Sequence, residues 1–460
     1  MKKISVYCEG WGERWLLGTL AYDGQRLLCE YFSEALHRGL ELSPRNLALR
    51  ALAYGDFPAH QMRLPGLVAD ALPDGWGLLL MDRLFRKNGR DPASVSPLDR
   101  LAFINGRALG ALTFEPSQKM DLPAEDVQLL ELAQQALVII ADRDSDALRA
   151  LAVMGGSPHG AHPKVLVHYN PASGYMSTTP FEGSAAWLVK LQAQDEHKEV
   201  CAIEVLYAEL AGAFGLDMPA TRYFNMDKKL AGFGIERFDV KDGMRVPVHT
   251  LAGFMHANFR LPSSVDYLTF LRATRFNTRS QVEVDKAFER AVFNVVFNNR
   301  DDHAKSLSYR MERDCAWRLA PGYDLTYCEG PGGEHQMDVC GEGRNITRAN
   351  IKARHDTQRL QACSLTWSSH LETARRRRAP RQTARAHCDG APVHYARHRP
   401  EQTRLYRLVQ QHGATSTLIC IARCWTACTG AVPTARWSSS KPPRRATWRC
   451  RRCCTGSSPD

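Results

Sequence analysis

Hydrophobic and polar positions divide the chain into segments of different character. Short apolar runs at residues 4–10, 15–22 and 26–32 predict β-strands, and Asp23-Gly24 between the last two is a strong hairpin signal. From Leu64 onward the apolar spacing becomes helical, with a break at residues 73–75. A helix, a turn and a strand then follow over residues 98–116, and we end this first region near Leu122.

The middle of the chain alternates between helices and strands. Residues 130–154 are mostly helical in pattern and lead into a Gly-rich loop at 155–164. Strands are predicted at 165–169 and 185–191, and the second carries Lys190. An amphipathic helix follows at Glu199–Phe214, closed by Gly215.

The last patterned segment ends in a dense polar cluster. Two strands at 221–226 and 231–240 are joined by a turn at Asp227-Lys228. A helix over 281–298 then runs into the sequence NRDDHAK, and residues 317–325, WRLAPGYDL, predict a strand running into a loop. Asp301 and Asp324 therefore flank a short predicted hairpin.

Composition is typical of a globular protein with two or three domains. The 460 residues are 44% hydrophobic and 24% charged. No apolar run approaches the roughly 20 residues of a membrane span, and no apolar segment follows the basic start as in a signal peptide. We therefore expect a cytoplasmic protein with no membrane partner.

Charge and cysteine separate the C-terminal part from the rest. The net charge is +11, yet residues 350–460 hold 21 of the 60 Lys and Arg and only 5 of the 49 Asp and Glu, so the rest of the chain is mildly acidic. Eight of the 14 cysteines also lie there, and the sequence after about Arg354 shows no sustained period. We interpret residues 351–460 as a frameshifted reading of the gene; a disordered basic extension is the alternative, and resequencing the gene distinguishes them.

Four pieces carry candidate chemistry. Three of them, taken singly, have plain structural readings: the Gly-rich loop can be a simple turn, Lys190 an edge residue of a strand, and residues 236–239 an exposed strand end. A Gly-rich loop can also cradle phosphate with its backbone N–H groups. Lys190 becomes a phosphate clamp if a helical carboxylate pairs with it, and Glu204 in the next helix is the candidate.

The fourth piece is the pair of aspartates. One carboxylate can accept the proton of an attacking hydroxyl while the other binds Mg²⁺ on nucleotide phosphates. Lys305, close after Asp301, can neutralise charge on a transferred phosphoryl group. A helix cap and a metal site made by His303 with both aspartates remain alternative interpretations.

Together these pieces, in this order, resemble a protein kinase, and more narrowly the HipA family of serine/threonine kinase toxins of bacterial toxin–antitoxin pairs. The resemblance covers about residues 1–350. It is carried by the segments ALPDGWGLLLMDRL, GALTFEP, GGSPHGAHPK, WLVK, the run from Glu204 to Pro219, GIERFDV, NRDDHAK and LAPGYDL. It implies an α+β, two-lobed kinase-like fold with a β-rich N-terminal subdomain at 1–122, a kinase-like core at 123–350 with an incomplete C-lobe, and the tail at 351–460.

The resemblance also implies roles for individual residues. Asp301 would be the catalytic base, assisted by Lys305, and Asp324 with Ser306 would hold Mg²⁺. The residues implied in ATP binding are Ser157, Gly160, Lys164, Lys190, Glu204, Glu236, Phe238 and Asp239. Of these, Glu236 and Phe238 would present hinge backbone to adenine and Asp239 would reach the ribose. Ser157 matches the serine that family members autophosphorylate to switch themselves off, which would place negative charge in a loop meant for ATP phosphates.

The sequence departs from the family at a few positions. Ser306 stands where relatives carry a metal-ligating Asn, His159 and His162 stand where many have Gly and Arg, and the tail resembles none of the family's last helices. The implied function is an ATP- and Mg²⁺-dependent toxin kinase acting on a translation component such as an aminoacyl-tRNA synthetase. Its partner would be a HipB-like helix-turn-helix antitoxin, through which alone it would meet DNA. Alternatives are a catalytically impaired HipA-like remnant that binds only nucleotide or antitoxin, and a nucleic-acid binder working through the basic tail.

Overall fold

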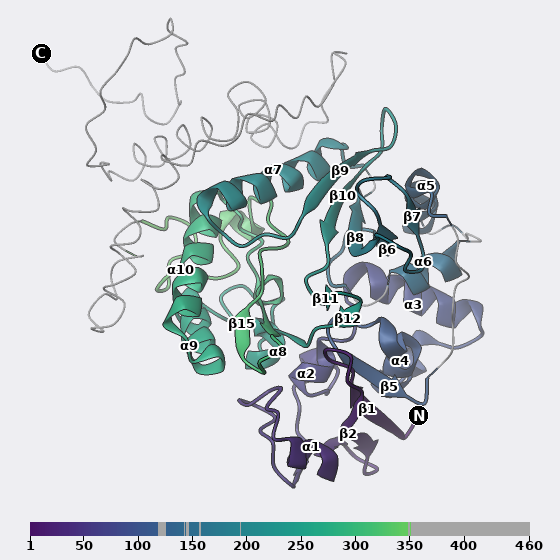
Figure 1. Cartoon of the computed structure of the whole chain (residues 1–460), viewed down its shortest axis with the longest axis vertical. Coiled ribbons are helices and arrows are strands. Elements are labelled where there is room, and N and C mark those ends of the chain that lie inside the picture. Colours follow the sequence, from purple (N-terminus) through teal and green to yellow (C-terminus); the bar gives the residue numbers. More distant parts are fainter. Residues whose placement is uncertain are drawn as a thin grey trace, which may run out of the picture.

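A computed structural model describes residues 1–117, 126–141, 143, 147–155, 158–193, 195–347 and 350. The predicted boundary near residue 122 and the tail at 351–460 lie outside these residues. Figure 1 shows three regions of regular structure, an N-terminal sheet, a second sheet, and a helical region at the opposite side that contains α9 and α10.

The N-terminal region is built on an antiparallel sheet in the order β4-β3-β2-β1-β5. Its strands are β1 (Lys3–Cys8), β2 (Trp15–Tyr22), β3 (Leu27–Tyr31), β4 (Ala53–Tyr54) and β5 (Leu112–Glu115). Alternate residues of β1 are buried, as expected for a sheet with one face against a core. The strands predicted from the three early apolar runs are confirmed.

Short helices cover this sheet and connect it to the rest of the chain. They are α1 (Ser33–Arg38), η1 (Ala59–Gln61), α2 (Gly66–Ala69), α3 (Gly75–Lys87), η2 (Pro92–Ser94), α4 (Pro97–Ile104) and η3 (Asn105–Arg107). The predicted break at residues 73–75 is the turn between α2 and α3. A capping box between Ser96 and Asp99 begins α4 and satisfies its first N–H groups.

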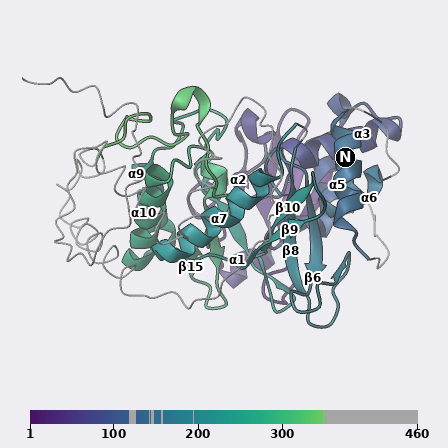
Figure 2. The same cartoon turned by 90° about the horizontal axis from the view of Figure 1, so that it is seen from above.

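The second region is a five-stranded antiparallel sheet in the order β7-β6-β8-β10-β9. Its elements are α5 (Leu129–Ile140), α6 (Leu148–Met154), β6 (Lys164–Tyr169), β7 (Met176–Ser177), β8 (Ala185–Leu191), α7 (Glu199–Phe214), β9 (Thr221–Asn225) and β10 (Ala231–Glu236). Helix α7 runs along β9 and β10 (Figure 2) and ends at Gly215, whose φ of 106° suits glycine.

The third region joins a small sheet, in the order β13-β14-β15, to a pair of helices. Its elements are β11 (Val240–Lys241), β12 (Met244–Arg245), β13 (Val248–Thr250), α8 (Leu251–Met255), α9 (Tyr267–Thr278), α10 (Gln281–Val296), η4 (Ala304–Ser306), β14 (Ser308–Met311), β15 (Trp317–Leu319) and η5 (Pro331–Gly333). Strands β14 and β15 form the hairpin expected between Asp301 and Asp324.

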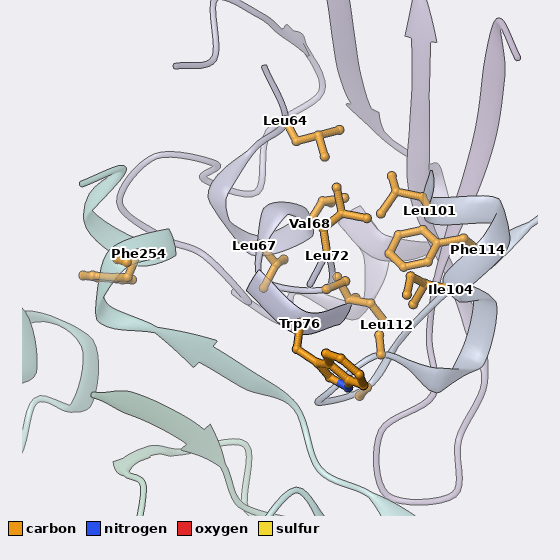
Figure 3. Packing of buried hydrophobic residues seen from close by; sticks show 14 of the residues in the cluster. Leu64, Leu67, Val68, Leu72, Trp76, Leu101, Ile104, Leu112, Phe114 and Phe254 are labelled. Atoms are coloured by element: carbon orange, nitrogen blue, oxygen red, sulfur yellow. The ribbon is translucent and has the colours of Figure 1, made fainter. Parts of the chain in front are cut away.

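The N-terminal region shares its hydrophobic core with the third region. Leu64 and Val68 belong to the same buried cluster as Phe254 of α8 (Figure 3). The backbones come so close that a side-chain carbon at Gly66 would lie 1.9 Å from the Gly253 carbonyl oxygen, so only glycine fits there.

A buried polar network crosses the same contact. Both ring nitrogens of His249 are hydrogen-bonded. Its Nε2 lies 3.0 Å from Ser43 Oγ, and its Nδ1 lies 2.7 Å from Asp70 Oδ2. Asp70 also accepts hydrogen bonds from the backbone N–H and the hydroxyl of Thr250. Ser43, Asp70, His249 and Thr250 are all buried. This polar network therefore stabilises the contact between the two regions and is not placed to act on a substrate.

Candidate active site

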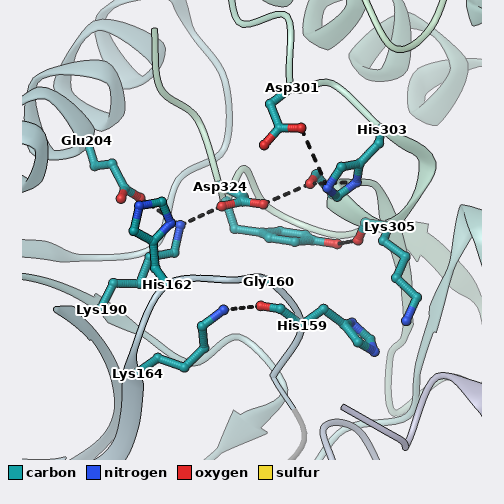
Figure 4. A network of polar contacts seen from close by, with 12 residues as sticks. His159, Gly160, His162, Lys164, Lys190, Glu204, Asp301, His303, Lys305 and Asp324 are labelled. Atoms are coloured by element: carbon teal, nitrogen blue, oxygen red, sulfur yellow. Dashed lines mark hydrogen bonds and ion pairs between the residues drawn. The ribbon is translucent and has the colours of Figure 1, made fainter. Parts of the chain in front are cut away.

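The site is centred on Lys190, which strand β8 presents between two carboxylates. Its Nζ lies 2.7 Å from Glu204 Oε2 on α7 and 2.5 Å from Asp324 Oδ1 (Figure 4). The predicted pairing of the strand lysine with the helical glutamate is therefore present, and Asp324 joins it from a segment 134 residues away.

Asp324 is held in place from both sides along the chain. The Tyr323 hydroxyl donates to the Lys305 carbonyl and lies 2.5 Å from Ser308 Oγ, which fixes the loop to residues 305–308. Leu325 is buried in the cluster formed by α7 and α10. Asp324 itself has a φ of 57°, a left-handed conformation that these flanking contacts impose.

The two charges at the centre stabilise each other. Burial alone would raise the pKa of Asp324, but the Lys190 ammonium, together with His303 and Lys164, holds that pKa well below its usual range. Burial would likewise lower the pKa of Lys190, but Asp324 and Glu204 raise it above its ordinary value. Both groups are therefore charged at neutral pH.

Asp301 and Asp302 follow one another but have different surroundings. Asp302 is buried, and it accepts hydrogen bonds from the Tyr267 hydroxyl and the Gln336 backbone N–H and lies 2.7 Å from His335 Nδ1. The side chain of Asp301 is 50% exposed and faces the site (Figure 4). Asp302 thus anchors the loop and leaves Asp301 available to a substrate.

The electrostatic surroundings of Asp301 suit a proton acceptor. Burial and the nearby Asp324 carboxylate raise the pKa of Asp301, while His303, with Nε2 3.9 Å away, opposes that rise. A carboxylate with a raised pKa holds a proton more readily than an ordinary one, which a general base requires.

Ser306 stands beside Asp324. Its hydroxyl donates to Asp324 Oδ2 at 2.8 Å, and its oxygen lies 3.2 Å from His303 Nδ1. An ionised carboxylate next to a hydroxyl oxygen is a donor set that suits Mg²⁺, which takes one or two protein ligands and completes its shell with phosphate and water. Asp324 and Ser306 therefore fit the predicted metal.

The alternative of a direct three-ligand site is not supported. Among the described residues, no group of three His, Cys, Asp or Glu side chains is arranged to hold a metal ion. His303 instead lies against the ring of Phe259 and next to Ser306.

Lys305 points away from Asp301 (Figure 4) and toward the N-terminal region. Its Nζ lies 3.7 Å from Asp74 Oδ2 and 4.9 Å from the centre of the Phe259 ring. Burial lowers the pKa of Lys305, and Asp74 partly offsets this. Lys305 and Asp74 also line a small pocket of about 50 Å³ between the N-terminal region and α8.

The Gly-rich loop lies on the other side of the site. Gly160 donates its N–H to Asp74 Oδ1 at 2.5 Å, and Lys164 donates its Nζ to the His159 carbonyl. Burial lowers the pKa of Lys164 to about 8. His162 lies 3.1 Å from Glu196, and that contact raises the histidine pKa. Ser157, the predicted autophosphorylation site, lies outside the described residues.

The predicted hinge follows the end of β10. Glu236 is the last residue of that strand, and the Phe238 ring lies 5.3 Å from the ring of Tyr323, the neighbour of Asp324. Asp239 is buried, with both oxygens bonded to Arg237 and one also to the Gly110 N–H. Contact of Asp239 with ribose would require one of these bonds to open, and that role stays a prediction.

The residue that sequence reasoning missed is Asp74. It was visible only as part of a helix break, yet it contacts both the Gly-rich loop and Lys305. The segment ALPDGWG carried the available signal, because an Asp-Gly turn inside a helical pattern marks a special backbone position.

Comparison with known families identifies the class. The family model described as HipA-like C-terminal domain matches residues 156–391, and the one described as HipA N-terminal domain matches residues 9–115. The first covers more than half of the chain, so the protein belongs to the HipA family, and the predicted family is confirmed. No match is found among curated proteins.

Solved structures were also found to resemble this chain to different degrees. One is the Shewanella oneidensis MR-1 toxin–antitoxin system HipA, HipB and operator DNA complex, with 16% identity, a TM-score of 0.61, and coverage of 91% of this chain and 97% of that chain. Another is the Helicobacter pylori proinflammatory kinase CtkA, with 11% identity, a TM-score of 0.35, and coverage of 54% and 86%. The first confirms the predicted α+β, HipA-like fold; the second score is too low to compare folds. Among the described residues, every helix is too short or too polar to cross a bilayer.

Proposed function

We propose that this protein is an ATP- and Mg²⁺-dependent protein serine/threonine kinase that acts as the toxin of a toxin–antitoxin pair. The observation that carries the proposal is the convergence of Lys190, Glu204 and Asp324 beside Asp301. A cation held by a helical glutamate next to two carboxylates with different pKa shifts is the arrangement that phosphoryl transfer requires.

Each residue then has a role in the transfer. Asp301 accepts the proton of the substrate hydroxyl, whose oxygen attacks the γ-phosphorus as the bond to the β,γ-bridging oxygen breaks and ADP leaves. Lys190 binds the nucleotide phosphates. Asp324 and Ser306 would hold Mg²⁺, which supplies charge neutralisation on the phosphates when bound.

We propose the partner and the substrate by analogy with the family. The Shewanella relative is described in complex with HipB and operator DNA, which supports a HipB-like antitoxin for this chain, with DNA contacted through it. We propose a cytoplasmic protein substrate, such as an aminoacyl-tRNA synthetase, and self-inactivation by phosphorylation of Ser157 in the Gly-rich loop.

A catalytically impaired remnant is the second candidate, and Ser306 favours it. A single hydroxyl that already donates to Asp324 is a weaker Mg²⁺ ligand than an amide oxygen. A remnant would bind ATP or antitoxin without transferring phosphate.

Labelled ATP distinguishes the two. The purified chain is incubated with γ-labelled ATP and Mg²⁺, and phosphopeptides are mapped, alongside Asp301→Ala and the control Asp314→Ala at an exposed carboxylate that contacts Arg318 and the Ala316 N–H. We expect label on Ser157 in the wild type and the control and none in Asp301→Ala. Thermal protection by ATP without any label would support the remnant, and no protection at millimolar ATP would refute nucleotide binding altogether.

A further inference from the structure

We propose that Asp74 of the N-terminal region is a positioning residue of the phosphotransfer site, which ties the Gly-rich loop at Gly160 to the catalytic loop at Lys305. This inference rests on the proposed kinase function and adds to it a part of the machinery that lies outside the kinase-like core.

The first observation is that the Asp74 carboxylate does not cap its own helix. Asp74 occupies the N-cap position of α3, where aspartate normally accepts a hydrogen bond from the helix's own first turn. Here its side chain makes no capping bond. One oxygen instead accepts the N–H of Gly160, 86 residues later in the chain, and the other faces Lys305 Nζ at 3.7 Å. The helix forgoes a stabilising cap, and the carboxylate is used between two loops.

The second observation is how closely the turn fits the Gly-rich loop. Gly75 has a φ of 42°, and a side-chain carbon there would lie 2.5 Å from the Gly160 carbonyl oxygen. The next residue, Trp76, donates its backbone N–H to that same carbonyl at 3.1 Å and its indole N–H to the Lys164 carbonyl at 3.2 Å. The turn at 74–76 is therefore hydrogen-bonded both to Gly160 and to Lys164, the last residue of the loop.

The third observation concerns the cation at the other end of the link. Lys305 is buried, with a side chain 12% exposed, and the charged or titratable groups that face it are Asp74, Asp70, Arg260 and His159. Among the residues facing Lys305, Asp74 is the one that also bonds the Gly-rich loop.

The consequence is that the two loops cannot change their spacing independently. Moving the Gly-rich loop outward breaks the bond from Gly160 and leaves Asp74 with Lys305 alone. Displacement of a catalytic group by about 1 Å can cost on the order of 100-fold in rate, so a fixed spacing matters for transfer to an acceptor. The N-terminal region thus takes part in catalysis without touching the reacting atoms.

The test compares Asp74→Asn with a matched control, Asp56→Asn. Asp56 lies in the same region, is 80% exposed on its side chain, pairs with Arg26 and has a φ of 58° that asparagine tolerates. Three quantities are measured on the full chain: urea unfolding, hydrogen exchange of the peptide spanning residues 158–166, and phosphotransfer with separate kcat and KM for ATP.

We expect two changes in Asp74→Asn and none in the control. Exchange at Gly160 becomes roughly three- to tenfold faster, because a charge-assisted hydrogen bond is replaced by a neutral one. The value of kcat falls about 10- to 100-fold, more than KM rises. Asp74→Glu, which keeps the charge, should recover part of the lost kcat.

Other outcomes overturn the inference in distinguishable ways. Equal kcat and loop exchange in Asp74→Asn and Asp56→Asn would remove Asp74 from the site while leaving the kinase function intact. Faster exchange spread over all peptides, together with a kcat equal to that of the wild type, would reduce Asp74 to a stabilising residue. A wild type that binds ATP and never transfers phosphate would instead refute the proposed function, and the link to catalysis with it.

Discussion

Lys190→Met removes the cation shared by Glu204 and Asp324 while keeping most of the side-chain volume. The side chains of Lys190, Glu204 and Asp324 are 14%, 11% and 35% exposed. Removing one partner from a fully buried ion pair costs about 3–5 kcal/mol. Because about a third of Asp324 meets water, we expect the loss in unfolding free energy to lie lower, at about 2–3 kcal/mol.

The loss depends on pH in a direction that the structure determines. In the wild type, Lys190 keeps the pKa of Asp324 below its usual range, so this carboxylate stabilises the fold above its unfolded pKa of about 3.9 and ceases to do so as the pH falls through the lowered value. In the variant, burial is opposed only by His303 and Lys164, so the pKa of Asp324 is higher than in the wild type and its ionisation favours folding less. The difference between the two proteins should therefore grow as the pH rises from about 4 to about 7.

Urea unfolding followed by tryptophan fluorescence at pH 5 and pH 7.5 measures this difference. The control is Lys241→Met, which replaces an exposed lysine on β11. The double variant Lys190→Met/Glu204→Gln should recover part of the stability, because one uncompensated charge is gone, without recovering phosphotransfer. A Lys190→Met protein as stable as the wild type at pH 7.5, or a loss that is the same at both pH values, would refute the assignment of Lys190 as the shared cation.

Three further predictions concern single side chains. Asp301→Asn should lower phosphotransfer about 10²- to 10⁴-fold. Because the pKa of Asp301 is raised, the acid limb of wild-type activity should lie above the ordinary aspartate pKa of about 3.9. Thermal protection of the variant by ATP and Mg²⁺ should survive, and loss of that protection would contradict a purely catalytic role. Ser306→Ala should raise the Mg²⁺ concentration needed for half-maximal ATP protection, since a candidate ligand is removed; an unchanged titration would leave Asp324 as the metal ligand without it. Burial lowers the pKa of His159 to about 4, so wild-type stability should fall as the pH drops from about 6.5 toward 4; His159→Gln should flatten this dependence in urea titrations, and an equally steep profile would show that another group is responsible.

Much of the local structure could be predicted from the sequence, because it depends on local pattern. The early strands, the helix Glu199–Phe214 and the break before Gly75 all appear where apolar spacing and turn residues placed them. The pairing of Lys190 with Glu204 could also be predicted from the sequence, since the two residues lie in consecutive elements. These features need no knowledge of distant segments.

Other elements depend on long-range contacts and were missed. Helix α9 (Tyr267–Thr278) contains three threonines and an asparagine, which are weak helix formers, and it is stabilised by burying Tyr267 and Phe270 against the core. Strand β13 has three residues, too few to show a period, and exists because β14 pairs with it.

The candidate site divides in the same way. That Asp301 and not Asp302 faces the site follows from contacts with Tyr267 and His335, which no spacing rule reveals. The contact of Asp74 with Gly160 and Lys305 joins three segments that are far apart in the chain. Sequence alone supplied the candidate carboxylates, and tertiary contacts assign each one its surroundings.

The hydrogen-bonded series of Ser43, His249 and Asp70 has a consequence for experiments that divide this protein into fragments. A fragment of residues 1–117 made alone would expose Asp70 without its three donors and Ser43 without its histidine. The complementary fragment would carry His249 and Thr250 with no acceptor. These hydrogen bonds can form only between the two halves. We therefore expect mixed halves to assemble into one noncovalent complex in which the bonds form again.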